Sequence, residues 1–328
     1  MEPTTRARCI RADDNATGER HWRTPLANAL GVDGMYRRAL VIIGCLALLA
    51  AGCGQAAPPA TRGGGPAQAP TYAAKGQVGT PTRNRDTLYL ATPGAATTQV
   101  AAVAPASRAV LRASTIPGRW ALPAIGLAKV PDGLSGDGST LVLQEVGGRH
   151  TISRFAVLDS AMRKPAQVAV LHGWFDYDAV SPDGGTLYLI EHLAANDLLH
   201  YRVRSYEVAN RQLDEAIVVD KRELDEASMQ GLPNTRVSDG GWAWTLYRSP
   251  KGPFIHALDL GQKFAVCIDL PAKARSSDRV ARLWTLTYDE PSGELHAANT
   301  ALHLAVRVQF NENDPFGYRV ATGELTTN

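Results

Sequence analysis

Four aspartates, Asp132, Asp176, Asp178 and Asp289, are the side chains of this sequence with the most obvious capacity for chemistry. Carboxylates that lie close together can act as general acid and general base, because each one changes the pKa of the other. Asp176 and Asp178 stand two residues apart, so in a strand their side chains share a face. The alternative interpretation is that all four only accept hydrogen bonds at turns and strand ends.

Sequence motifs for metal binding, nucleotide binding or a serine nucleophile are missing beyond residue 84. This part of the chain has no HExxH, HxH, CxxC, GxGxxG, GxxxxGK[ST] or GxSxG pattern and no EF-hand spacing. Its histidines, including His192 at the end of an apolar run, are therefore interpreted as structural or exposed. We expect no metal, no cofactor and no assigned catalytic residue.

The elements that must position these side chains are short strands that recur along the chain. The clearest copy is SPDGGTLYL at residues 181–189, in which Pro presets φ and Gly supplies the positive φ of a tight turn. Five copies align on Leu88, Leu141, Leu187, Ala243 and Leu295, with steps of 53, 46, 56 and 52 residues. A period near 50 with four short strands per unit is typical of β-propeller blades.

Further strand-like segments fill each unit. They occur after the aligned strands (99–104, 152–159, 201–208, 254–260, 302–310), at the ends of the units (168–171, 216–219, 265–270, 318–325) and before the turns (127–130, 176–180, 235–237, 283–288). Residues 220–230 have helical composition and are interpreted as an excursion between blades. The pattern predicts an all-β domain, a β-propeller of about five four-stranded blades. The first blade lacks a good innermost strand, and an open or distorted ring is an alternative.

The segment at residues 181–189 resembles the WD-repeat-like β-propeller repeat of bacterial envelope proteins, in which SPDGxxLYV lies between the first two strands of a blade. Residues 135–138 and 238–241 match that repeat loosely. The resemblance implies the propeller fold and is almost silent on function, because propellers serve many unrelated roles.

The propeller resemblance suggests two uses for the candidate residues. Five-bladed propeller glycosidases place three carboxylates on inner strands, and Asp132, Asp176, Asp178 and Asp289 are the residues that could take such places. Aromatic residues at a propeller mouth can bind sugars or peptides, which makes Trp174 a candidate, with packing between blades as the alternative. These five residues form the predicted ligand face.

The charge balance argues against nucleic acid as a partner. The chain has 34 basic and 32 acidic side chains, and residues 1–52 hold seven and five of these, which leaves 27 of each. A nucleic-acid surface normally shows a basic excess or a basic stripe.

The N-terminal part indicates where the protein resides. Residues 35–38, MYRR, precede an apolar run at 39–51 and then Gly52-Cys53, which is the order of a secretory signal peptide. The run is short for a transmembrane helix, which needs about 20 residues. LAAGC at residues 49–53 resembles the bacterial lipobox, which implies that Cys53 is lipidated and becomes the first mature residue. Ordinary cleavage near Gly52 and an uncleaved anchor are the alternatives.

Four parts are therefore expected. Residues 1–34 are a mis-assigned start or an extension, and residues 35–52 are a lipoprotein signal peptide. Residues 53–83 are a flexible Ala/Pro/Gly linker with too little apolar surface to offset ordering entropy, and residues 84–328 are the propeller. Cys267, the one cysteine of the propeller, is expected to be a buried apolar residue without a disulfide.

The expected location is the cell membrane, lipid-anchored and facing outside the cytoplasm. The expected partners are the membrane, through the anchor, and a protein or glycan of the cell envelope. A binding or scaffold function is preferred over catalysis. The alternative is an envelope enzyme that acts on a glycan or a small metabolite through inner-strand carboxylates.

Overall fold

The computed structural model describes residues 77–148, 150–220, 222, 228–311 and 314–325. The expected extension, the signal peptide, Cys53 and most of the linker lie outside these residues. Within the described part of the chain, no helix has the length and apolar character that crossing a membrane requires.

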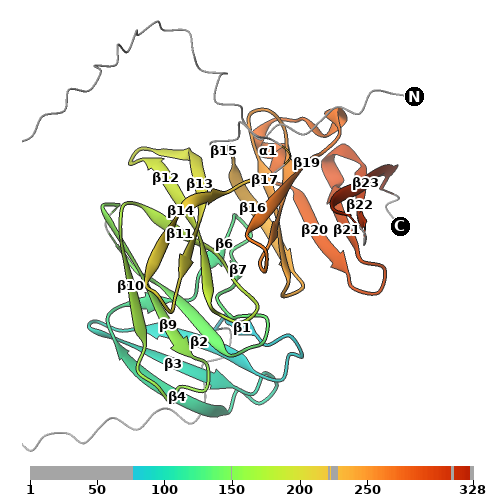
Figure 1. Ribbon diagram of the computed structural model, residues 1–328. Helices are drawn as coiled ribbons and strands as arrows, with labels where there is room; N and C mark the ends of the chain where they lie inside the picture. The colour runs from blue at the N-terminus through green and yellow to red at the C-terminus, as the bar shows by residue number, and fades with distance from the viewer. Residues whose placement is uncertain (1–76, 149, 221, 223–227, 312–313, 326–328) are drawn as a thin grey trace, which may run out of the picture. The chain divides into compact units, whose positions relative to one another are not determined.

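Five antiparallel sheets follow one another in chain order (Figure 1), so the protein is an all-β propeller of five blades over the described residues. The first blade contains β1 (Thr80–Pro81), β2 (Leu88–Pro93), β3 (Thr97–Val103) and β4 (Val110–Pro117). The second contains β5 (Trp120–Ala121), β8 (Thr140–Glu145), β9 (Ile152–Asp159) and β10 (Gln167–His172). The third contains β11 (Phe175–Val180), β12 (Thr186–Ala194), β13 (Asp197–Glu207) and β14 (Gln212–Val218), with β15 (Met229–Gln230) paired to β13.

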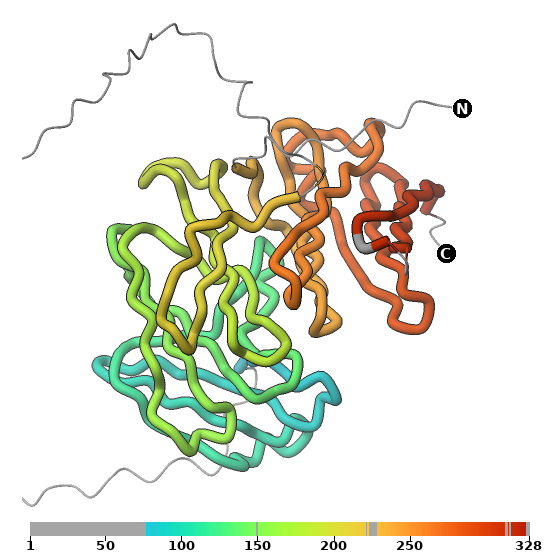
Figure 2. Tube along the Cα trace, viewed as in Figure 1, coloured from blue at the N-terminus to red at the C-terminus, as the bar shows by residue number. Residues whose placement is uncertain are grey.

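The last two blades each contain four strands in sequence order. Figure 2 traces the chain through them toward its C-terminal end. The fourth contains β16 (Leu232–Ser238), β17 (Trp242–Arg248), β18 (Phe254–Asp259) and β19 (Phe264–Asp269). The fifth contains β20 (Trp284–Asp289), β21 (Glu294–Asn299), β22 (Leu304–Asn311) and β23 (Asp314–Glu324). Helical structure in the described chain is limited to α1 (Asp278–Ala281), η2 (Ala272–Ala274) and η3 (Thr300–Leu302).

The predicted turns form through the same side-chain contacts in two blades. In the third blade, Ser181 Oγ donates to Asp183 Oδ1 at 2.6 Å and accepts from the Thr186 amide at 2.9 Å. Ser135 of the second blade makes the corresponding contacts with Asp137 at 2.7 Å and with Thr140 at 2.9 Å. These hydrogen bonds satisfy the turn backbone and explain why serine and aspartate recur at this spacing.

Apolar clusters lie between consecutive blades and hold them together. Tyr89 packs with Leu141 between the first two blades, and Phe155 with Leu187 between the second and third. The third and fourth share the cluster of Tyr188 and Tyr247, and the fourth and fifth share that of Trp244 and Trp284.

The junction between the fifth and first blades is different, because none of the apolar clusters of the described residues joins them. An ion pair connects them instead, between Arg83 and Glu290 at 2.6 Å, and both side chains are about two-thirds exposed. Exposed pairs contribute little to stability, so this junction is the weakest of the five.

Two expected boundaries in the first and second blades are wrong. The propeller begins at Thr80 rather than at residue 84, because Thr80 pairs with Tyr89 and its hydroxyl donates to the Asp132 carbonyl at 2.8 Å. Residues 127–130 do not form a single inner strand. They lie in the hairpin of β6 (Ala124–Ile125) and β7 (Val130–Pro131), while β5 takes the edge of the second sheet beside β8.

Two further expectations concern the region around Cys267. Asp220 bridges to Ala265, and Met229 and Gln230 form β15, so both ends of the segment at 220–230 are extended rather than helical. Residues 221 and 223–227 of that segment lie outside the described residues. Cys267 is buried as expected. It is disulfide-bonded, however, so the expectation of an unbonded cysteine is wrong. Its partner lies outside the described residues.

Candidate functional site

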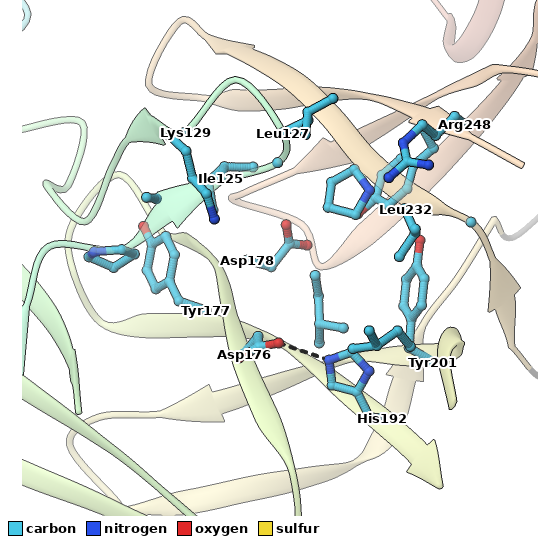
Figure 3. A pocket seen from close by; sticks show the side chains of 18 of the residues that line it. Ile125, Leu127, Lys129, Asp176, Tyr177, Asp178, His192, Tyr201, Leu232 and Arg248 are labelled. Carbon is cyan, nitrogen blue, oxygen red and sulfur yellow. Dashed lines mark hydrogen bonds and ion pairs between the residues drawn. The ribbon is translucent and has the colours of Figure 1, made fainter. Parts of the chain in front are cut away.

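A pocket of about 370 Å³ lies where the β6–β7 hairpin, the third blade and the fourth blade meet (Figure 3). The hairpin reaches this position because it is docked on β16. The Leu127 amide donates to the Pro233 carbonyl at 3.3 Å, and the Ala128 amide donates to the Asn234 carbonyl at 3.0 Å. Gly126 permits the approach, since a Cβ there would lie 2.7 Å from the Asn234 carbonyl oxygen.

The innermost strand of the third blade carries a β-bulge in the wall of this pocket. Asp176 pairs with Ile190 and Tyr177 with Leu189, and the register then shifts at Asp178. Bulges change the direction of a side chain and are common beside functional sites. Asp176 and Asp178 both line the pocket, and Figure 3 shows the Asp178 carboxylate pointing into it.

Arg236 links Asp178 to Asp132 from the fourth blade. Its guanidinium contacts the Asp178 carboxylate and backbone carbonyl, and one Nη lies 3.4 Å from Asp132 Oδ2. Burial lowers the pKa of Arg236, but the charges of Asp178 and Asp132 outweigh it and raise the pKa above its ordinary value. The arginine therefore stays charged and holds one oxygen of each carboxylate.

One oxygen of Asp178 is left without a protein partner. The Asp178 side chain is 1% exposed, and its Oδ1 is the atom that pairs with Arg236. Its Oδ2 is buried and has no hydrogen-bond partner among the described residues. An unpaired buried acceptor is costly, which makes it a marker for a ligand contact in a pocket wall.

Asp176 is held by two polar neighbours. Gln144 Nε2 donates to its Oδ1 at 2.9 Å, and His192 Nε2 lies 2.9 Å from its Oδ2. Burial raises the pKa of Asp176, but the hydrogen bonds from His192 and Gln144 outweigh it and lower the pKa below its ordinary value. Asp176 is thus a carboxylate, and it orients the His192 ring at the pocket wall.

Aromatic stacking on Trp174 also holds the His192 ring in place. The rings of Trp174 and His192 are stacked with centroids 4.0 Å apart, and His150 stacks on Trp174 at 3.8 Å. His192 Nδ1 is buried and has no partner among the residues that the structure describes. Trp174 is not among the residues that line the pocket, so its contribution is to hold His192.

Cations line the side of the pocket opposite the carboxylates (Figure 3). Lys129 is exposed, occupies the hairpin turn at a φ of 52°, and has no ion-pair partner within the described chain. Arg248 is paired with Asp278. Between the charged groups the wall is apolar and aromatic, from Leu127, Ile190, Leu198, Leu232, Tyr201 and Tyr247.

Of the five predicted ligand-face residues, four gather around this pocket. Asp176 and Asp178 line it, Trp174 supports His192, and Asp132 accepts from the Tyr177 hydroxyl at 3.2 Å behind the wall. Asp289 lies elsewhere, at the end of β20, where it is exposed and accepts from the Ser292 hydroxyl. Asp289 therefore makes a contact within a turn and does not line the pocket.

Three contributors were not predicted as site residues: His192, Lys129 and Arg236. His192 ends an apolar run next to a glutamate, and the sequence holds nothing that pairs it with Asp176. Arg236 stands in the fourth copy close to where the third has its aspartates, which is a usable sequence indication. The described residues contain no cluster of three or more His, Cys, Asp or Glu side chains suited to a metal ion.

No protein-family model matches the sequence, and no curated protein matches it either. Solved structures resemble it weakly. Hydrazine synthase from Kuenenia stuttgartiensis has 14% identity and a TM-score of 0.44 over 70% of this chain and 63% of its own. Periplasmic gluconolactonase from Pseudomonas aeruginosa has 12% identity and a TM-score of 0.40 over 75% and 69%.

TolB from Acinetobacter baumannii has 11% identity and a TM-score of 0.38 over 66% of this chain and 50% of its own. The chain thus spans less than two thirds of the matched hydrazine synthase and TolB chains. Likenesses of this strength carry no statement about function.

Proposed function

We propose that this protein is a binding module of the cell envelope that holds a small ligand in the pocket between the hairpin and the third and fourth blades. The observation that carries the proposal is Asp178 Oδ2, a buried acceptor without a partner in a pocket wall. The pocket volume of about 370 Å³ falls in the range of small-molecule sites.

The proposed setting follows from the N-terminal sequence. Lipidation of Cys53 would tether a WD-repeat-like propeller to the outer side of the membrane through the Ala/Pro/Gly-rich residues that follow. A ligand pocket on such a tether suits capture of small molecules, or of exposed glycan or peptide ends, at the membrane surface.

The test compares two exposed leucines of the β12–β13 hairpin. Leu198 lines the pocket and is 52% exposed, whereas Leu193 is 46% exposed and does not line it. Leu198→Trp should therefore block the pocket without disturbing the buried ion pairs, and Leu193→Trp is the matched control. The full chain and both variants are dialysed against a small-molecule extract of the producing cells, and retained compounds are identified by mass spectrometry.

We expect at least one compound to be enriched by the wild type and by Leu193→Trp. Its enrichment should fall about tenfold or more in Leu198→Trp, because a filled pocket excludes the ligand. Equal enrichment by all three proteins, or no enrichment by the wild type, would overturn the proposal.

A second candidate function is catalysis, and the Asp176–His192 pair favours it. A carboxylate that orients an imidazole at a pocket wall is the arrangement of many general bases. Incubation of the enriched compound with the wild type separates the two functions. Recovery of the compound unchanged supports binding, whereas conversion that is lost in His192→Gln would establish an enzyme.

A further inference from the structure

We infer that the pocket takes a zwitterion of amino acid or dipeptide size, with its ammonium against Asp176 and Asp178 and its carboxylate toward Lys129. This inference rests on the proposed binding function and names its ligand class. It depends on three features of the pocket: unpaired acceptors on one side, an unpaired cation on the other, and an apolar wall between them.

The unpaired atoms on the β11 side call for hydrogen-bond donors. A carboxylate oxygen can only accept, so Asp178 Oδ2 requires a donor. His192 Nε2 faces the Asp176 carboxylate at 2.9 Å and must therefore donate to it. In the neutral imidazole the other nitrogen is then an acceptor, and it also lacks a partner within the described chain.

The charge on this side favours a cationic donor. Three carboxylates, those of Asp132, Asp176 and Asp178, lie in or directly behind the wall, and Arg236 is the one guanidinium shared by two of them. The excess is negative, and an ammonium provides three donors together with the compensating charge.

The opposite side of the pocket disfavours a ligand that carries only an amine. The Lys129 ammonium points into the pocket from the hairpin turn, and no carboxylate of the described residues pairs with it (Figure 3). A ligand with positive charge alone would be repelled by this cation, weakly because Lys129 is exposed to solvent. A ligand that also carries an anionic group satisfies both sides.

The space between the charged sides is apolar and small. Leu127, Ile190, Leu198 and Leu232 line it, which suits an apolar ligand body. A volume of about 370 Å³ is near the lower end for small-molecule sites, so an amino acid or a dipeptide fits better than an oligosaccharide.

The probes are four forms of leucyl-leucine, titrated into the full chain by calorimetry: free, N-acetylated, C-amidated, and blocked at both ends. The free zwitterion should bind tightest. Acetylation should lower the affinity about tenfold or more, because the buried Asp178 carboxylate then loses the ligand ammonium as its partner. Amidation should weaken it less, by about threefold, because Lys129 is exposed to solvent.

Variants assign each end to its residue. In Lys129→Met, amidation of the dipeptide should no longer weaken binding, whereas acetylation should still weaken it. Lys164→Met, at an exposed position, should leave both losses of affinity unchanged. In Asp178→Asn, acetylation should cause a smaller loss of binding affinity than in the wild type. Should that variant fail to fold, Asp176→Asn provides the same readout at a half-exposed position with 42% of its side chain accessible.

Three results would overturn the ligand class. The first is equal affinity for the free and acetylated dipeptides, and the second is an undiminished loss of affinity on amidation in Lys129→Met. The third is absence of binding by all four forms. The binding function would survive that last result if Leu198→Trp still abolished enrichment from the cell extract, so the two failures are distinguishable.

Discussion

The Arg236 guanidinium is ion-paired with the Asp178 carboxylate across 58 residues of sequence, and the two side chains are 2% and 1% exposed. The pair joins the innermost strands of the third and fourth blades. It also fixes the orientation of Asp178, so that one carboxylate oxygen is bound to arginine and the other is left for the pocket.

Removing one member of this pair should be strongly destabilising. Arg236→Met leaves the Asp178 carboxylate buried without its cation, and we expect the free energy of unfolding at pH 7 to fall by about 3–5 kcal/mol. Urea denaturation followed by fluorescence measures the change. The double variant Arg236→Met/Asp178→Leu should recover part of the loss, because an apolar pair replaces the ion pair.

The control for that comparison is an exposed ion pair. Arg282 and Asp278 lie 2.8 Å apart, with 45% and 57% of their side chains exposed. Arg282→Met should leave the denaturation midpoint unchanged within error. A loss as large as that of Arg236→Met would contradict the distinction between buried and exposed pairs.

Two turn glycines provide a matched test of the contact between the second and third blades. Gly184 and Gly138 have φ values of 73° and 72°, so alanine is strained at both. A Cβ at Gly184 would lie 2.1 Å from Thr140 Oγ1 and 2.4 Å from its Cβ, whereas a Cβ at Gly138 meets no atom within 4 Å.

Gly138→Ala should cost about 1–2 kcal/mol, the ordinary cost of a left-handed alanine. Gly184→Ala should cost at least about 1 kcal/mol more, because Thr140 of the neighbouring blade must move. Chemical denaturation of both variants checks the order. Equal losses would mean that the turn of the third blade does not pack on Thr140.

Buried His256 should make stability dependent on pH. Burial lowers its pKa to about 4, and the nearby charges act in both directions, Asp178 and Asp220 raising the pKa and Arg236 lowering it. In the unfolded chain a histidine titrates near 6.5. Between these values the unfolded state binds more protons, so stability falls as pH decreases through this window.

The loss attributable to His256 between pH 7 and pH 5 should be about 2 kcal/mol. His256→Leu should reduce the pH dependence of the unfolding free energy by that amount. The exposed His172→Gln should not reduce it. An unchanged pH profile in His256→Leu would show that this ring is not held neutral in the folded protein.

The expected lipid anchor gives a prediction about the mature N-terminus. If Cys53 is the lipidated residue, protein from the native membrane fraction should begin at Cys53 and carry acyl mass. Intact and peptide mass spectrometry measures both features. An N-terminus upstream of Cys53, or a soluble unmodified product, would remove the membrane setting from the proposal.

The strand repeat could be predicted from the sequence because each turn is specified locally. Ser181, Asp183 and Gly184 make their turn with neighbouring atoms, and the same holds for Ser135 and Gly138. Alternation and turn chemistry therefore located the five blades. They also brought Asp176 and Asp178 together, because residues two apart on one strand need no knowledge of distant segments.

The rest of the site depends on distant contacts that no local pattern encodes. Lys129 reaches the pocket because its hairpin docks on the Pro233 and Asn234 carbonyls, about a hundred residues away in sequence. The single strand predicted at residues 127–130 missed that hairpin. Asp289 fitted the expected pattern equally well, but it contacts Ser292 within a turn. It lies away from the pocket because the fifth blade contributes no residue to the pocket lining.

The most direct test of the pocket as the ligand site is hydrogen-exchange mass spectrometry of the full chain, with and without the compound enriched from the cell extract. We predict slower exchange in peptides that cover residues 124–131 and 186–194, and no such change in Leu198→Trp. Slower exchange confined to outer strands such as β4 and β10, with the pocket segments unchanged, would contradict the account.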